Sequence, residues 1–370
     1  MKTDQLKNRI EAVIFGKDND SSLAKVLTKV SKVYALTMAV RLRLYKCNLL
    51  KTRRLPCKVI SIGNITLGGT GKTPMTLYMA ELIKSIKLNP AIVCRGYKGK
   101  YEYSEQMVTD GVKIFMGPEQ AGDEPYLMAT KLSDVPVFVG KNRYVSGMKA
   151  WESFQPDVII LDDAFQHIRL FRDLNLLLLD AAKPFGNGHI FPRGILRESL
   201  EQVDRADALV ITRAEPHRLE NGFFKENKMI SDKPFFRCRH MPDAVSVLNS
   251  EGMWVKCSPD SIRGEKCLAF AGIAKNEDFL RILTDFGCRL ANFINFPDHH
   301  AFSVNDVETI LRTAKKNQVK FLITTEKDRV KLPKNIFSTM KIYTIGIRIS
   351  FIEHDEDRFR EFIYNTVTST

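Results

Sequence analysis

A glycine-rich turn, Thr66–Thr73, is the part of the sequence with the clearest chemistry. It joins a short apolar stretch, Lys58–Ile62, to a segment of helical character, Pro74–Lys84. Backbone N–H groups of such a turn converge on one point, its lysine reaches the β- and γ-phosphates of a nucleotide, and its threonine hydroxyl binds Mg²⁺. The usual pattern begins with glycine where this chain has Thr66, so the turn is a variant, and an ordinary glycine-rich turn is the alternative. The predicted nucleotide-binding residues are Thr66, Leu67, Gly68, Gly69, Thr70, Gly71, Lys72 and Thr73.

Acidic side chains follow two apolar strands downstream of this turn. Val158–Leu161 is followed by Asp162 and Asp163, and the next apolar strand ends in Asp180. A phosphate-loop protein needs such an acid at the carboxyl end of a buried strand to hold Mg²⁺. We favour Asp162 and Asp163, because a doubled acid is unusual at a strand end and Gln166 follows in the same loop. An aspartate that caps the next turn is the alternative, and for Asp180 it is the preferred one.

A second acidic motif, Gly122-Asp123-Glu124-Pro125, precedes a helix-like run. Aspartate at a helix start most often caps free N–H groups. The functional interpretation is that one of the two acids is a base for an acceptor hydroxyl, because phosphoryl transfer to an alcohol benefits from a positioned carboxylate.

Adjacent histidines, His299 and His300, follow Phe296-Pro297-Asp298. Ser303 and Asp306 fit a capping box for the helix that begins at Val304, and this box leaves the histidine pair without a structural purpose. Histidines in this setting are more often polar surface residues than catalytic ones. Since neighbouring side chains of a regular element face different ways, we do not expect the pair to bind a metal.

The elements that must position these residues alternate between apolar strands and helical stretches. The strand-like runs are too continuously apolar for a half-exposed sheet, so the pattern predicts an α/β fold with a mostly parallel sheet covered by helices on both faces, as in phosphate-loop NTPases. Ligands of such sheets bind at the carboxyl ends of the strands. The 370 residues are divided into a basic amphipathic helical segment (1–54), a phosphate-loop core (55–212), a connecting region (213–265) and a smaller C-terminal α/β lobe (266–370). Within the connecting region, short strands are predicted at Pro234–Cys238 and Val245–Leu248.

The formal net charge of +13 favours polyanionic partners: nucleic acid, anionic lipid or a phosphorylated substrate. Aromatic and basic residues do not interleave in a way that supports nucleic acid. Seven cysteines, an odd number with no Cys-x-x-Cys pair, predict free thiols in a reducing compartment.

The N-terminal segment carries an apolar stripe at helical spacing among many lysines and arginines. No run in it is long enough to cross a bilayer, which takes about 20 residues. From the periodicity alone, a helix lying in a membrane interface and a surface helix docked on its own domain are equally supported. The stripe consists of Leu23, Val26, Leu27, Val30, Val33, Tyr34, Met38 and Leu42.

Taken together, the ordered motifs resemble those of the tetraacyldisaccharide 4′-kinases, the lipid A 4′-kinases of Gram-negative bacteria. The resemblance extends from about residue 33 to the end of the second alternating unit, and the variant turn that begins at Thr66 is itself a feature of that family. The motifs are Ser61–Asn64, Gly68–Pro74, Arg95-Gly96-Tyr97, Gly122–Pro125, Asp162–His167, Leu196-Arg197-Glu198, Pro297-Asp298-His299 and Thr324–Asp328.

This resemblance implies transfer of the ATP γ-phosphate to the 4′-hydroxyl of a tetraacylated glucosamine disaccharide 1-phosphate. The reaction would take place at the cytoplasmic face of the inner membrane, with the N-terminal helix as a peripheral or monotopic contact. By motif, Asp123 matches the catalytic base and His299 its partner on the second lobe. Lys72 matches the phosphate lysine, Thr73 the Mg²⁺ hydroxyl, and Asp162 and Asp163 the acids near the metal. The candidate substrate residues are Asn64, Arg95, Tyr97, Glu124, Gln166, Arg197 and Glu198.

Two other classes of protein remain as alternatives. A phosphate-loop nucleotide hydrolase or switch acting at a membrane surface would need a base-reading motif, which Thr325–Asp328 only half resembles. A non-catalytic binder of nucleic acid or membrane would show salt-sensitive binding without acceptor phosphorylation. We expect ATP and Mg²⁺ as cofactors, a lipid disaccharide as substrate, no nucleic acid and no obligate protein partner.

Overall fold

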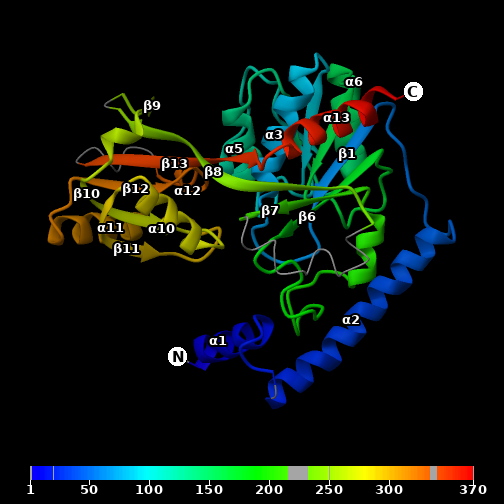
Figure 1. Ribbon diagram of the computed structural model, residues 1–370, viewed down its shortest axis with the longest axis horizontal. Helices are drawn as coiled ribbons and strands as arrows, with labels where there is room; N and C mark the ends of the chain where they lie inside the picture. Colours follow the sequence, from blue (N-terminus) through cyan, green and yellow to red (C-terminus); the bar gives the residue numbers. More distant parts are fainter. Residues whose placement is uncertain (1, 20, 216–231, 250, 334–339, 370) are drawn as a thin grey trace.

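The computed structural model describes residues 2–19, 21–215, 232–249, 251–333 and 340–369. Within these residues, two lobes share one mixed sheet of thirteen strands, and Figure 1 shows the lobes side by side. The order is β11-β10-β12-β13-β8-β7-β6-β1-β5-β2-β4-β3, with β9 paired to β8. All neighbours are parallel except β3 with β4, β8 with β9 and β8 with β13.

The first lobe is built on β1 (Lys58–Gly63), β2 (Pro90–Cys94), β3 (Gln106–Thr109), β4 (Val137–Val139), β5 (Val158–Asp162), β6 (Leu174–Asp180) and β7 (Ala208–Thr212). Its helices are α3 (Lys72–Ser85), α4 (Pro118–Ala121), α5 (Asp123–Lys131) and α6 (Arg143–Phe154). Alternate residues of β5 enter different cores: Ile160 packs in the cluster with Met79 of α3, and Ile159 in the cluster with Ala150 of α6. Both faces of the sheet are therefore covered, and the predicted α/β class is confirmed.

The second lobe repeats this arrangement at smaller scale. Its parallel strands are β10 (Lys266–Ala271), β11 (Arg289–Asn295) and β12 (Phe321–Thr325). Cys267 and Ala269 of β10 pack with Phe279 of α10 (Asn276–Asp285), whereas Leu268 of β10 packs with Ile310 of α11 (Val304–Lys316). The predicted capping box is present, because Ser303 Oγ accepts from Asp306 N and the Asp306 carboxylate accepts from Ser303 N.

Two long strands join the lobes. Residues 216–231 and 250 of the predicted connecting region lie outside the described residues. The two short strands expected there form one strand, β8 (Phe235–Leu248), which pairs with β7 through Phe235–Arg237 and with β13 (Lys341–Phe351) through Cys238–Val247. β9 (Trp254–Cys257) pairs with β8, and the one-turn helix α12 (Glu326–Arg329) precedes β13 in the chain.

The last helix, α13 (Asp355–Thr368), belongs to the core of the first lobe and not to the C-terminal lobe in which the sequence placed it. Phe359 and Ile363 are fully buried in the same cluster as Met75 and Met79 of α3. In Figure 1, α13 crosses back over the first lobe beside α3. The strand pair β8–β13 makes this return possible, since it carries the chain from the second lobe to the first.

The N-terminal segment forms two helices along the lower edge of the molecule in Figure 1, α1 (Lys2–Ile14) and α2 (Ser22–Lys46). Ser21 caps α2 by accepting from Ala24 N. Ser31 Oγ of α2 donates to Ile190 O, and the buried Arg193 guanidinium donates to Val13 O and to Asn19 Oδ1. None of the described helices has the length and apolar character that crossing a membrane requires.

Candidate functional site

The predicted phosphate loop connects β1 to α3 and opens into a cavity of about 910 Å³ between the lobes. Gly68 and Gly71 have φ angles of +106° and +89°, in the region that favours glycine. A Cβ atom on Gly71 would lie 2.3 Å from His240 Nε2, so no larger residue fits there. Residues 67–73 all line the cavity, whereas the buried Thr66 pairs with Leu196 below it.

Lys72 and the two predicted acids meet beside this loop. Lys72 Nζ lies 3.7 Å from Asp163 Oδ1, and Arg197 donates to both Asp163 oxygens at 2.9 and 3.1 Å. Burial opposes the charged form of Asp163, but the Lys72 and Arg197 cations outweigh it and lower the pKa of that carboxyl. Asp163 is therefore a carboxylate at neutral pH.

Asp162 has the opposite electrostatic environment. Its Oδ1 accepts from Thr76 Oγ1 at 2.8 Å. Burial, together with the nearby carboxylates of Glu124 and Asp163, raises the pKa of Asp162 to about 7. A cation bound beside Asp162 would relieve the repulsion among these three carboxylates.

These residues fit a Mg²⁺ ion of the phosphate-loop kind. Thr73, Asp162 and Asp163 offer only oxygen donors, which Mg²⁺ prefers, and such sites are completed by phosphate oxygens and water. Among the described residues, no three His, Cys, Asp or Glu side chains converge as a dedicated protein cage for a metal. Mg²⁺ is the expected partner ion.

Asp180, the competing acid, has a structural role. Its carboxylate binds Arg213 NH1 at 2.7 Å and also contacts Lys275 of the second lobe. Although burial opposes ionisation, these two cations lower the pKa of Asp180. Asp180 Oδ1 also accepts from Ala182 N at 3.0 Å, as expected of an aspartate that caps the next turn.

Asp123 and His299 meet across the lobes. His299 Nδ1 lies 3.2 Å from Asp123 Oδ2, and both side chains are more than four-fifths buried. Gly122 is the N-cap of α5. Its φ of +91° favours glycine, and a Cβ atom at this position would lie only 3.0 Å from Tyr97 O. Gly122 occupies the cap position, and Asp123 is the first helical residue. The Asp123 carboxylate is therefore not used as a cap, and Asp123 lines the cavity.

The two histidines face different ways, as expected. His300 Nε2 lies 3.0 Å from Asp306 Oδ2, and its ring stacks on Phe296 with a centroid distance of 4.7 Å. His300 thus supports the start of α11. His299 lines the cavity and forms a T-shaped contact with the Tyr97 ring, with 5.9 Å between the ring centroids.

The predicted substrate residues divide into two groups. Those that line the cavity are Arg95, Tyr97, Glu124, Gln166 and Arg197. Asn64 and Glu198 are buried away from its wall. Asn64 Oδ1 lies 3.5 Å from Lys72 Nζ and so orients the phosphate lysine, and Glu198 forms an ion pair with Arg205. Both residues therefore contact basic side chains beside the site, and their contact with substrate stays a prediction.

Comparison with known proteins explains why these groups occur together. Residues 23–368 match the model of the LpxK family, described as tetraacyldisaccharide-1-P 4′-kinase. The chain belongs to this family. It is 42% identical over 365 residues to a tetraacyldisaccharide 4′-kinase of Desulfatibacillum aliphaticivorans, covering 97% of each chain. It is 39% identical to that of Syntrophus aciditrophicus, covering 84% of this chain and 85% of the relative.

A solved structure agrees with these relatives. LpxK from Aquifex aeolicus, determined in complex with ATP, superimposes with a TM-score of 0.73 at 32% identity and covers 93% of this chain and 99% of that one. The predictions of a phosphate-loop fold, of a lipid A biosynthesis kinase and of ATP as its cofactor are confirmed.

Three cavity residues of this LpxK family member were missed by the sequence reasoning. His240 of β8 packs against Gly71, and its buried Nε2 has no hydrogen-bond partner among the residues that the structure describes. Arg213 follows β7, and Lys327 of α12 contacts the Asp123–His299 pair. Lys327 belongs to the motif Thr324–Asp328, so its position after β12 was a signal in the sequence. No local pattern marks His240 or Arg213.

Proposed function

We propose that this kinase transfers the ATP γ-phosphate to the 4′-hydroxyl of a tetraacylated disaccharide 1-phosphate, with Asp123 as the base. The observation that carries this proposal is that the phosphate loop and the Asp123–His299 pair line the same cavity. A nucleotide hydrolase or switch does not require a carboxylate–imidazole pair assembled from two lobes.

Each reacting group has a residue near it. Lys72 and the loop N–H groups would bind the β- and γ-phosphates. When bound by Thr73 and the Asp162–Asp163 pair, Mg²⁺ would neutralise charge on the transferring phosphate. Asp123 takes the proton of the acceptor hydroxyl as the new O–P bond forms and the bond to the ADP oxygen breaks.

The position of the base between two lobes has a further consequence. Asp123 is on α5 of the first lobe and His299 on the second, so the site is complete only while the lobes are together. We propose that their closure excludes water and suppresses wasteful ATP hydrolysis.

We also propose that α2 lies in the interface of the cytoplasmic leaflet of the inner membrane, as a peripheral or monotopic contact. Val33 and Leu36 are each 64% exposed, and further exposed apolar residues follow the same helical spacing. Tyr34 and Met38 of α2 are half-buried and line the cavity, as expected of a helix docked on the first lobe. Such docking does not explain the exposed apolar residues on the outer side of α2. The exposed residues are Val26, Val30, Val33, Leu36 and Val40.

Binding to vesicles tests the membrane contact. The double variant V33E/L36E should lose binding to anionic vesicles, because two charges interrupt the apolar stripe. V112E is the matched control, since Val112 is 87% exposed in a loop of the first lobe. Equal binding by all three proteins would contradict the interfacial role of α2.

Product analysis tests the reaction itself. The purified protein in detergent should convert Mg-ATP and the lipid disaccharide 1-phosphate into ADP and a lipid with a second phosphomonoester, placed at the 4′ position by ³¹P NMR and mass spectrometry. ATP hydrolysis without lipid phosphorylation would favour the hydrolase, and phosphate at another hydroxyl would refute the proposed regiochemistry.

A further inference from the structure

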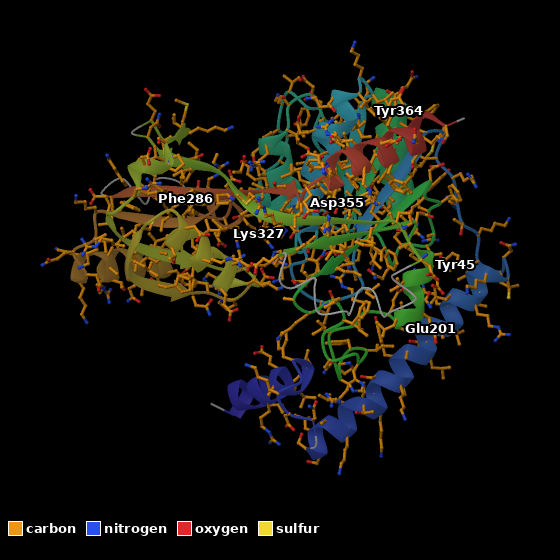
Figure 2. All side chains as sticks on the ribbon, in the orientation of Figure 1. Tyr45, Glu201, Phe286, Lys327, Asp355 and Tyr364 are labelled. Carbon is orange, nitrogen blue, oxygen red and sulfur yellow. The ribbon has the colours of Figure 1, made fainter. Side chains whose placement is uncertain are left out.

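Lys327 of α12 extends the Asp123–His299 pair into a chain of three residues. Its Nζ lies 3.2 Å from His299 Nε2, 3.1 Å from Glu124 Oε1 and 3.5 Å from Asp298 Oδ1. Figure 2 labels Lys327 at the junction of the two lobes. The lysine thus reaches the ring nitrogen that Asp123 leaves free.

The charge of the lysine decides the direction of these hydrogen bonds. Burial disfavours the ammonium, but the carboxylates of Glu124 and Asp298 outweigh this effect and raise the pKa of Lys327. Glu124 is ionised as well, because the Lys327 and Lys72 ammonium groups overcome its burial and lower its pKa. A charged ammonium has three donors and no acceptor, so the nearby His299 Nε2 must accept.

We propose that Lys327 is a positioning residue that holds His299 in the tautomer protonated at Nδ1. In this tautomer, Nδ1–H donates to Asp123 Oδ2 and leaves the other carboxylate oxygen for the substrate proton. The inference rests on the proposed role of Asp123 as base. During transfer, the hydroxyl proton moves to Asp123, while Lys327 and His299 keep their own protons.

The backbone around Gly272 holds the lysine and the histidine in a fixed relation. Gly272 N donates to Asp328 Oδ2 at 2.9 Å, and Gly272 O accepts from His299 N at 3.2 Å. Thr325 caps α12 by accepting from Asp328 N at 3.0 Å. The residue beside Lys327 and the backbone of His299 are therefore anchored to the same glycine, which prepares the contact before substrate arrives.

Three further charged or aromatic groups face this chain of residues. Lys331 Nζ lies 3.8 Å from Asp123 Oδ2 and 2.9 Å from Asp328 Oδ1. Asp298 Oδ2 lies 3.8 Å from His299 Nε2, and the Tyr97 ring meets the imidazole edge on. Without the Lys327 ammonium, the carboxylate of Asp298 would attract a proton to Nε2 and so favour the wrong tautomer.

Nitrogen NMR of the full-length protein in detergent tests the tautomer directly. Among its seven histidines, the ¹⁵N signals of His299 are assigned by their loss in H299Q. In the wild type, we expect a protonated Nδ1 and an unprotonated Nε2. K327M should shift these signals towards protonation at Nε2, whereas K327R, which keeps the charge and the donor, should retain the wild-type pattern.

Kinetics separates a positioning role from a simple ion pair. K327M should lower kcat about 10- to 100-fold, the usual loss for an outer hydrogen-bond partner, with the KM for ATP changed less than about threefold. K327R should restore most of kcat. E124Q removes the Lys327–Glu124 ion pair but keeps the lysine on the ring, so it should preserve the tautomer. K320M, in an exposed pair with Glu265, is the control for loss of one positive charge.

An unchanged His299 tautomer in K327M would overturn the inference, as would a kcat equal to that of the wild type. If the wild type transfers no phosphate to the lipid, the proposed function fails, and the NMR comparison still decides whether Lys327 sets the tautomer.

Discussion

The salt bridge between Lys131 and Glu326 should control how well the two lobes stay together. Lys131 Nζ of α5 lies 2.6 Å from Glu326 Oε2 of α12 and 3.0 Å from Asp243 Oδ2 of β8. The Lys131 and Glu326 side chains are only 19% and 10% exposed. Although burial opposes its charge, the attraction of Glu326 and Asp243 raises the pKa of Lys131. The pair therefore joins the two elements that carry Asp123 and Lys327.

The cost of losing this contact follows from its type. A hydrogen bond between charged, partly buried groups contributes about 1.5–3 kcal/mol. If K131M destabilises the closed arrangement of the lobes by that free energy, the ratio of closed to open molecules falls about 10- to 150-fold, since about 1.4 kcal/mol is a factor of ten. Because closure is needed for chemistry and not for nucleotide binding, the loss should occur in kcat, with the KM for ATP changed less than about threefold.

A double-mutant cycle measures this effect. The steady-state rate of phosphate transfer from labelled ATP to the lipid is determined for the wild type, K131M, E326Q and the double variant. The double variant should be little slower than K131M, because each change breaks the same contact. K84M is the control, since Lys84 pairs with the exposed Asp134 at 3.8 Å and should change kcat less than about twofold. Wild-type kcat in K131M would show that the Lys131–Glu326 pair does not hold the lobes together.

Substitutions at Asp162, Gly71 and Arg193 should each have a distinct effect. The pKa of Asp162 is raised from its ordinary value of 3.8 to about 7, so this carboxyl binds its proton more tightly in the folded than in the unfolded protein. Without metal, the free energy of unfolding should therefore fall as pH rises from about 4 to 7. Denaturant titrations in EDTA should show this slope reduced in D162N, and an equal slope would contradict the assignment. G71A should weaken ATP binding at least about tenfold in calorimetry, because its Cβ meets His240 Nε2 at a left-handed backbone position; wild-type affinity would show that the loop adapts. R193A should expose α1 to limited proteolysis with kcat retained, since Arg193 holds Val13 O; unchanged cleavage would show that other contacts suffice.

The parts of the fold that local sequence predicts are those whose burial is local. β1, the glycine turn and α3 are contiguous, so the motif contains its own strand, loop and helix. β8 was divided in two because Arg239, His240 and Pro242 interrupt its apolar pattern. Its continuity comes from pairing with β13, about 100 residues away, and no sequence window contains that partner.

The site shows the same division. The phosphate loop and the acids after β5 could be predicted, because each motif carries its chemistry locally. Asp123 and His299 were only weak candidates alone and were joined by resemblance to a family. The sequence also does not show that Asn64 contacts Lys72 or that Glu198 pairs with Arg205, because both contacts depend on how the folded loops pack.

Substitution of Asp123 by asparagine tests whether this carboxylate is the base. Single-turnover transfer by D123N should be slower by about 10²- to 10⁴-fold, the usual contribution of a general base, while calorimetry finds wild-type affinity for ATP. Wild-type transfer by D123N, at equal ATP affinity, would show that another group removes the acceptor proton.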